Sequence, residues 1–312
     1  MSFKVLVTCP PMLKQIEQFH DMFEGRGIEV TAPEVVQTLS VDELLAMVPT
    51  HDGWIIGDDP ASAEVFEAGK AGQLKAAVKW GIGVDNVDFA ACEKLGIPIT
   101  NTPGMFGAEV ADLAMCYLSG LARDAFFIDR EIRKGGWPKP AGISLTGRTI
   151  GIVGLGDIGR NIAKRAKAYD LNIIGWDPYV KSIPEYIKYI DTFPSGISAC
   201  DFIVFACALT VDSHHLLDES ILDLLKPGVR VVNVSRGPLI KEAALLEGLA
   251  NGIITSAALD VFELEPLNQN HEILNHPKCI VGSHNGSNTT DAVFRASKEA
   301  IRLLDEMLRR VS

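Results

Sequence analysis

The chain has 312 residues, of which 47% are hydrophobic and 22% charged, a balance typical of a folded globular protein rather than a disordered one. Its length favours two domains of roughly 100–200 residues each. The formal net charge is −11 and no run is rich in Lys or Arg, so a phosphate backbone would be repelled and we expect no nucleic-acid partner.

The start of the chain and its cysteines indicate a cellular location. Residues 1–7 lead directly into a strand pattern, without the charged leader, apolar stretch and cleavage site of a secretory signal. No apolar run reaches the ~20 residues of a membrane span. The six cysteines lie far apart and lack metal-ligand spacing, so we expect buried, reduced thiols, no metal site and a cytoplasmic location.

Short apolar runs alternate with longer amphipathic stretches over the first hundred residues, a pattern typical of parallel βαβ units. The strand-like runs are residues 5–8, 28–31, 54–56, 76–79 and 97–100. A turn cluster at 101–104 follows them. Residues 108–134 then have the composition of one long helix that connects the two domains and ends before Gly135-Gly136-Trp137-Pro138.

A second series of strand-like runs occupies the rest of the chain. These runs are residues 149–153, 171–176, 202–207, 229–234, 255–259 and 279–281. Residues 289–309 carry apolar side chains at near-helical spacing, which predicts a last helix that returns to pack on the first domain. The pattern as a whole predicts an α/β protein with two doubly wound parallel-sheet domains.

A glycine-rich turn follows the first strand of the second series. Binding a pyrophosphate requires a strand, a turn that brings backbone N–H groups close to it, and the N-terminus of a helix. Strand 149–153 and a helical stretch at 158–169 flank the turn. Its residues are Gly154, Leu155, Gly156, Asp157, Ile158 and Gly159. Gly154 permits the turn, Gly156 the close approach and Gly159 the helix packing, so we predict that this loop cradles a dinucleotide.

Asp177 strengthens this interpretation. A glycine loop alone occurs in many ordinary turns, but Asp177 ends the next strand, about 20 residues further on, where a carboxylate accepts a hydrogen bond from a ribose hydroxyl. Its charge would repel a 2′-phosphate, and Pro178 and Tyr179 supply no arginine to bind one. We therefore predict NAD rather than NADP as the cofactor.

Three polar side chains follow later strands and are candidates for chemistry. Arg236 follows 229–234 and can bind a carboxylate with two parallel hydrogen bonds. Glu265 and His284 follow the next two strands, and a carboxylate beside an imidazole stabilises its protonated form, which is an acid for reducing a keto group. The carboxyl ends of parallel strands are where open α/β sheets bind ligands.

Each of these residues taken alone also has a structural interpretation. Arg236 can be a surface ion-pair residue, Glu265 a solvated loop acid and His284 a hydrogen-bonded histidine, so only their coincidence at three strand ends favours catalysis. The other histidines of this half lie in loop-like sequence and are expected to be solvated. These are His214, His215, His271 and His276. No GxSxG elbow supports a serine hydrolase.

Further motifs give the chain a family likeness. They are Gly81-Ile82-Gly83-Val84-Asp85-Asn86-Val87-Asp88, Asn101-Thr102-Pro103-Gly104, Val232-Asn233-Val234-Ser235-Arg236-Gly237, Asp260-Val261-Phe262 with Glu265-Pro266, and Ser283-His284. Together with the glycine loop and Asp177, they make the chain resemble the D-isomer-specific 2-hydroxyacid dehydrogenase family, most closely its phosphoglycerate dehydrogenase-like members, over nearly the whole length.

The resemblance implies a role for each matching residue. His284 would be the acid/base, Glu265 would orient it, and Arg236 would bind the substrate carboxylate and carbonyl. Backbone N–H groups of Gly81, Ile82 and Gly83 would help to hold that carboxylate. Asp260 would contact the nicotinamide amide, and Thr210 would lie near the cofactor.

The resemblance also implies a domain arrangement and an activity. A Rossmann cofactor domain, residues 102–285, would be inserted into a flavodoxin-like substrate domain, residues 1–101 and 286–312. The protein would be a homodimer that transfers a hydride between NAD(H) and a D-2-hydroxy acid or 2-keto acid, such as 3-phosphoglycerate or a related acid. The alternative is an NAD-sensing interaction protein on the same fold.

Departures from the family pattern leave the substrate open. His284-Asn285-Gly286-Ser287 stands where the family often has His-Ile-Gly-Gly, and Ala208-Leu209-Thr210 where it often has Pro-Leu-Thr. Because the chain ends at Ser312, we expect no C-terminal regulatory domain. Lys79 can pair with a distal phosphate or carboxylate, whereas the loop at Asp58 and Asp59 would oppose one, so a neutral or hydroxylated side chain is an open alternative.

Overall fold

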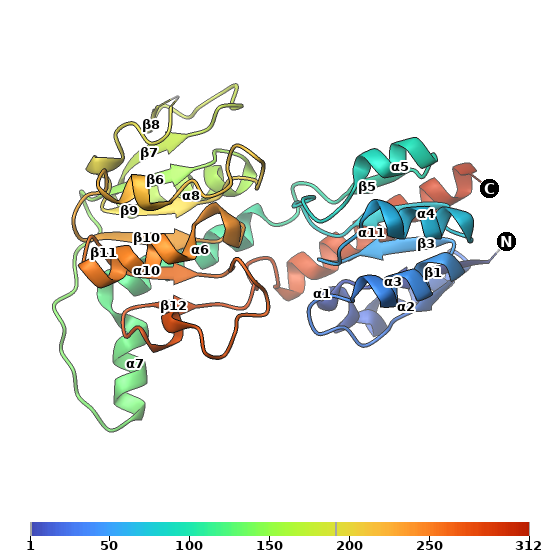
Figure 1. Cartoon of the computed structure of the whole chain (residues 1–312), viewed down its shortest axis with the longest axis horizontal. Helices are drawn as coiled ribbons and strands as arrows, with labels where there is room; N and C mark the ends of the chain where they lie inside the picture. The colour runs from blue at the N-terminus through green and yellow to red at the C-terminus, as the bar shows by residue number, and fades with distance from the viewer. Residues whose placement is uncertain (1, 191, 312) are drawn as a thin grey trace. The chain divides into compact units, whose positions relative to one another are not determined.

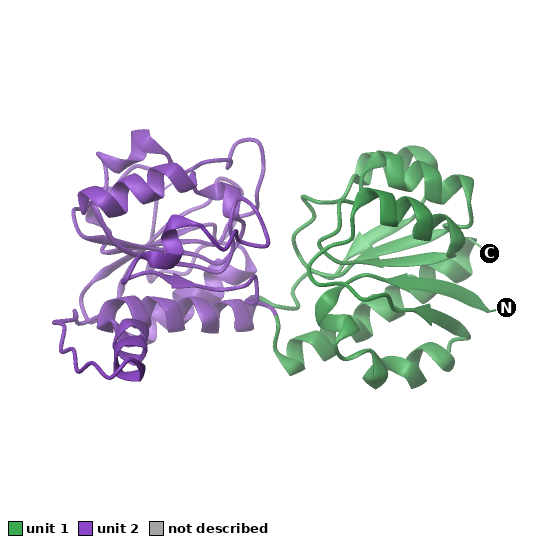
Figure 2. Cartoon of the chain, turned by 60° about the horizontal axis from the view of Figure 1, so that its bottom comes forward, with its two compact units in different colours: residues 1–106, 288–312 green, residues 107–287 purple. Residues whose placement is uncertain are grey.

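The structure is a computed structural model that describes residues 2–190 and 192–311. It forms two compact units (Figure 2): unit 1 comprises Met1–Phe106 and Asn288–Ser312, and unit 2 comprises Gly107–Ser287. The domain boundaries expected from the sequence, at 101/102 and 285/286, lie a few residues before these divisions. No helix in the described ranges is long and apolar enough to cross a membrane.

Unit 1 is built on a parallel sheet in the order β2-β1-β3-β4-β5, of which Figure 1 labels β1, β3 and β5. Its strands are β1 (Phe3–Val7), β2 (Ile28–Thr31), β3 (Gly53–Ile56), β4 (Ala76–Lys79) and β5 (Ile99–Asn101). The helices are α1 (Pro10–Leu13), α2 (His20–Glu24), α3 (Val41–Met47), α4 (Ala63–Ala71), α5 (Phe89–Leu95) and α11 (Thr290–Val311). This strand order is flavodoxin-like and confirms the predicted fold.

The core of unit 1 explains why its strands read as continuous apolar runs. β3 and β4 are buried along their whole length, as parallel strands covered on both faces must be. Helix α11 packs on these two strands through an apolar stripe that includes Ala300 and Leu304. The prediction that the last helix returns to the first domain is confirmed.

Unit 2 is built on a second parallel sheet in the order β12-β11-β10-β9-β6-β7-β8. Its strands are β6 (Thr149–Val153), β7 (Asn172–Trp176), β8 (Ile187–Tyr189), β9 (Phe202–Phe205), β10 (Val229–Asn233), β11 (Ile254–Leu259) and β12 (Ile280–Val281). The helices are α6 (Gly107–Arg123), α7 (Ala125–Arg133), α8 (Asp157–Ala168), α9 (Glu219–Leu222) and α10 (Glu242–Asn251). The order reverses between β9 and β6, which is the Rossmann arrangement.

Three expectations need correction. The single helix expected over 108–134 is two helices, because Asp124 adopts a left-handed conformation with a φ of 51° that ends α6 and starts α7. The short edge strand β8 was not predicted, since three residues of mixed polarity carry little periodicity. Cys116 is exposed rather than buried, although all six cysteines are unbridged.

Candidate active site

Three glycines shape the turn between β6 and α8. Gly154 has a φ of 95°, a conformation that glycine adopts without strain. A Cβ on Gly159 would lie 1.9 Å from the Gly154 carbonyl oxygen, whereas a Cβ on Gly156 would meet no atom within 4 Å. The turn is therefore closely packed against its helix and open at Gly156, the N-cap of α8, where the helix dipole favours an anion.

Asp177 lies beside this turn. It follows β7, and its two carboxylate oxygens accept hydrogen bonds from the backbone N–H groups of Leu155 and Tyr179, each at 2.8 Å. Asp157 and Ile158 form the first turn of α8. An acceptor next to an open helix N-terminus suits the ribose and pyrophosphate of a dinucleotide, so the residues present fit NAD.

Arg236, Glu265 and His284 follow three neighbouring strands. β10, β11 and β12 are adjacent and parallel (Figure 1), and the three residues come after their carboxyl ends. The glycine turn after β6 and the exposed Thr210 after β9 belong to the same edge of the sheet. Unit 2 thus gathers the predicted cofactor-binding and catalytic residues at the edge where open α/β sheets bind ligands.

The Glu265 carboxylate lies in direct contact with the His284 imidazole. Glu265 Oε2 is 2.8 Å from His284 Nδ1, and Glu265 Oε1 accepts a hydrogen bond from the Phe262 backbone N–H at 3.0 Å. Both side chains are only about one-quarter exposed, at 22% and 23%. His284 also has a φ of 53°, a conformation that is uncommon for non-glycine residues.

Asp260 holds the backbone around His284. Its carbonyl oxygen accepts the His284 N–H at 2.6 Å, and its buried carboxylate accepts the N–H groups of Asn285 at 3.2 Å and Gly286 at 2.8 Å. The Tyr117 hydroxyl donates to the same carboxylate at 3.3 Å. Burial, with the Asp260 charge adding to it, raises the pKa of Tyr117, so the phenol keeps its proton and stays a donor.

Asn233 positions the turn that carries Arg236. This buried last residue of β10 donates from Nδ2 to the Arg236 carbonyl at 2.8 Å and accepts the Ser235 N–H at 3.1 Å. Gly237, which follows Arg236, leaves room for the loop after β11, because a Cβ on Gly237 would lie 1.8 Å from the Phe262 carbonyl oxygen. Neither Asn233 nor Tyr117 was predicted as a site residue. Asn233 could have been found, because it is a polar residue at the end of an apolar strand, whereas no such signal marks Tyr117.

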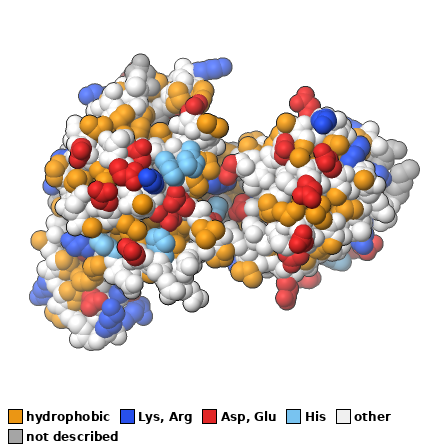
Figure 3. All heavy atoms as spheres, viewed as in Figure 1, with side chains coloured by type: hydrophobic (Ala, Val, Ile, Leu, Met, Phe, Trp, Pro, Cys, Tyr) orange, Lys and Arg blue, Asp and Glu red, His pale blue; other side chains and the backbone are white. Residues whose placement is uncertain are grey.

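Two other histidines of unit 2 are paired with carboxylates rather than solvated, so that expectation is wrong for them. His215 Nε2 lies 2.6 Å from Glu263 Oε1, and His271 Nε2 lies 3.0 Å from Glu242 Oε2. Each of these glutamates also accepts the other's backbone N–H. Figure 3 shows histidine and acidic side chains side by side on unit 2. No metal-binding group of His, Cys, Asp or Glu occurs within residues 2–190 and 192–311.

In unit 1, the predicted carboxylate-binding turn follows β4. Gly81 has a φ of 128°, and its N–H donates to Thr102 Oγ1 at 2.8 Å. Ile82 is exposed and Gly83 is partly exposed. The Gly81 N–H is thus engaged by a residue that follows β5, which leaves the N–H groups of Ile82 and Gly83 as the ones to consider for a substrate.

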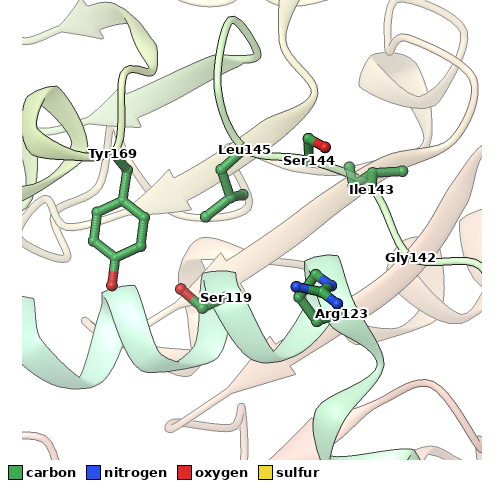
Figure 4. A pocket seen from close by; sticks show the side chains of 7 residues that line it. All are labelled: Ser119, Arg123, Gly142, Ile143, Ser144, Leu145 and Tyr169. Carbon is green, nitrogen blue, oxygen red and sulfur yellow. The ribbon is translucent and has the colours of Figure 1, made fainter.

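A pocket of about 670 Å³ lies elsewhere in unit 2 (Figure 4), beside α6. It is lined by Ser119, Arg123, Gly142, Ile143, Ser144, Leu145 and Tyr169. The Ser119 hydroxyl is buried there without a hydrogen-bond partner. None of the predicted site residues lines this pocket, so we assign it no part in the chemistry.

Comparisons with known proteins agree with this site. The family model for the D-isomer specific 2-hydroxyacid dehydrogenase NAD binding domain matches residues 115–286. The chain is 35% identical to the D-3-phosphoglycerate dehydrogenase of Methanocaldococcus jannaschii over 90% of its length, although it spans only 54% of that relative. It is 33% identical to the hydroxypyruvate reductase of Thermotoga maritima, over 93% of this chain and 94% of the relative.

A solved structure gives the same result for the fold. The glyoxylate reductase of Paecilomyes thermophila superposes with a TM-score of 0.84 at 26% identity, covering 99% of this chain and 96% of the other. The relatives named here carry three different substrate names at identities between 26% and 35%. The comparisons therefore agree on a class of reaction and leave the substrate undecided.

Proposed function

Because the chain belongs to the D-isomer-specific 2-hydroxyacid dehydrogenase family, NAD-dependent oxidoreductases that act on a CH–OH group, we propose that it interconverts a small 2-keto acid and its D-2-hydroxy acid. The observation that carries the proposal is the 2.8 Å contact between Glu265 Oε2 and His284 Nδ1. It lies at the sheet edge that also carries Arg236 and the glycine turn.

His284 acts as the acid in reduction and as the base in oxidation. When bound at the glycine turn and Asp177, NADH would supply the hydride to the substrate C2 atom, and NAD would accept it in the reverse direction. Since Nδ1 faces Glu265, proton exchange with the C2 oxygen falls to Nε2. In reduction the keto acid gains a hydride on C2 and the Nε2 proton on oxygen, which leaves neutral imidazole, NAD and the D-2-hydroxy acid.

The neighbouring residues prepare this step. The Glu265 carboxylate stabilises the imidazolium before transfer and holds the ring orientation. The Arg236 guanidinium binds the substrate carboxylate and polarises the carbonyl. In unit 1, the N–H groups of Ile82 and Gly83 remain the predicted carboxylate-binding groups, since the Gly81 N–H is engaged by Thr102. Thr210 and Asp260 remain predicted cofactor-side residues, with Asp260 also holding the His284 turn through hydrogen bonds to its backbone.

The test follows NADH absorbance with a panel of 2-keto acids. We expect the unmodified protein to turn over at least one acid and His284→Ala and Arg236→Ala to lose that activity. The matched control is His271→Ala, which removes another histidine paired with a glutamate in unit 2, at 3.0 Å from Glu242, and should keep activity. Equal rates in all variants would refute the assigned roles, and NAD binding without any turnover would favour an NAD-sensing protein.

We also propose that the protein is a cytoplasmic homodimer with no nucleic-acid partner. Helix α7 has no buried residue, and Phe126, Ile132 and Trp137 on and after it are 36%, 40% and 79% exposed. Apolar side chains gathered on one segment are typical of a subunit interface. Light scattering tests this: Trp137→Lys should weaken the dimer, and a monomeric unmodified protein would rule it out. The unbridged cysteines suit the reducing cytoplasm.

A further inference from the structure

The Lys79 ammonium is buried at the end of β4. Its side chain is 2% exposed, whereas that of Asp58, in the loop after β3, is 37% exposed. Lys79 Nζ donates to the Gly57 carbonyl at 2.6 Å and to Asp58 Oδ1 at 3.0 Å. The positive charge is thus internal and already paired, and the carboxylate is the member of the pair that solvent or a ligand meets.

The loop that carries Asp58 is held from several sides. The Asp59 carboxylate, fully buried, accepts the Leu39 N–H at 2.9 Å and the Gly57 N–H at 3.1 Å. The Asn86 side-chain amide donates to the carbonyls of Gly57 at 3.1 Å and Asp59 at 2.7 Å. This network holds the Gly57 carbonyl to which Lys79 Nζ donates, so the ion pair is part of the folded frame.

The same pair adjoins the predicted carboxylate-binding turn. Asp58 and Lys79 follow or end adjacent strands, β3 and β4, at the carboxyl edge of the unit 1 sheet, where such sheets bind ligands. A Cβ on Gly81 would lie 3.7 Å from Lys79 Nζ. A substrate whose carboxylate is bound at Ile82 and Gly83 would therefore lie beside the Lys79–Asp58 pair, and Asp58 is the exposed member of that pair.

We infer that the Asp58–Lys79 pair selects a 2-keto acid whose side chain is uncharged and bears a hydroxyl group, and that it disfavours a phosphorylated side chain. This inference rests on the proposed function. A phosphate monoester carries about −1.5 to −2 charges at pH 7. It would lie against the negatively charged Asp58, and the Lys79 ammonium is buried and bound to Gly57 and Asp58. A hydroxyl group instead donates a hydrogen bond to that carboxylate, which has about four lone-pair sites for such bonds.

The experiment compares kcat/KM for hydroxypyruvate, phosphohydroxypyruvate and pyruvate in the NADH assay. We expect the unmodified protein to favour hydroxypyruvate over each of the other two by about tenfold or more. Asp58→Asn keeps an oxygen for Lys79 and removes the charge, so it should move the ratio about tenfold toward the phosphorylated acid.

The matched control is Asp52→Asn. Asp52 and Lys75 form an ion pair of the same length, 3.0 Å, immediately before β3 and β4, at the opposite edge of the sheet. Asp52→Asn should therefore leave the ratio of kcat/KM values for hydroxypyruvate and phosphohydroxypyruvate unchanged. If Asp58→Asn fails to fold, the unmodified protein is assayed at increasing salt concentration instead. Because salt screens charge repulsion, the kcat/KM for the phosphorylated acid should rise relative to that for hydroxypyruvate.

The outcomes separate this inference from the proposed function. Preference of the unmodified protein for the phosphorylated acid would overturn the inference while leaving a dehydrogenase. The inference would also be overturned if Asp58→Asn and Asp52→Asn shifted the substrate ratio equally. If Asp58→Asn does not fold, a substrate ratio that does not change with salt would overturn it. Absence of turnover with every 2-keto acid would overturn the proposed function itself, and the inference with it.

Discussion

Asp260→Asn should lower kcat more than it raises the KM for NADH. The Asp260 carboxylate accepts the N–H groups of Asn285 and Gly286 and the Tyr117 hydroxyl. An asparagine amide has one oxygen, so an NH₂ group must face at least one of these donors. Losing a hydrogen bond to a buried charged acceptor costs about 1.5–3 kcal/mol. If that loss disturbs the His284 turn in the transition state, kcat falls about 10- to 100-fold.

Steady-state kinetics with varied NADH and varied keto acid measure this split. Tyr117→Phe is the milder companion: its 3.3 Å hydrogen bond is the longest of the three, and the phenyl ring keeps the packing, so the fall in kcat should be smaller. Thermal unfolding of both variants checks the fold. A raised KM for NADH at unchanged kcat would refute the positioning argument and indicate that Asp260 acts through the nicotinamide.

Three further outcomes are expected. Asp177→Ala should relax the preference for NAD over NADP, measured as the ratio of kcat/KM values, because the carboxylate repels a 2′-phosphate; an unchanged ratio contradicts the assigned role. Gly159→Ala should lower Tm by forcing apart atoms that a Cβ would bring to 1.9 Å, at the Gly154 carbonyl, an overpacking that costs about 1–3 kcal/mol. The third outcome concerns acid stability. Burial by itself opposes the Asp201 charge, but hydrogen bonds led by that of Lys226 hold the pKa of this carboxyl below its ordinary value of 3.8. The unfolded chain therefore binds the proton more readily, so this stabilisation is present above pH 3.8 and is lost as pH falls through the lower folded-state pKa. Asp201→Asn should unfold more easily at pH 7 and lose less stability on acidification, as denaturant titrations at several pH values would show.

The local features of this protein were readable from its sequence. The glycine turn, α8 and Asp177 lie within a single βαβ unit, where spacing along the chain and proximity in space coincide. The parallel strands were equally readable, because burial on both faces makes each one a short apolar run. The positions of Arg236, Glu265 and His284 after three later strands made them candidates, and the family motifs assigned each of them a role.

Packing between distant segments decided what the sequence left open. The sequence showed that Lys79 and Asp58 give opposing signals, and only the fold showed that the ammonium is buried and paired while the carboxylate faces outward. Tyr117 reaches Asp260 across 143 positions of the chain, a contact that no local pattern encodes. The sequence by itself determined the class of fold and the cofactor turn, since periodicity and turn chemistry are local. The burial of the Lys79 ammonium and the exposure of the Asp58 carboxylate came only with the tertiary structure, as did the 2.8 Å distance between Glu265 Oε2 and His284 Nδ1, because long-range packing sets which side chains meet and which are shielded from water.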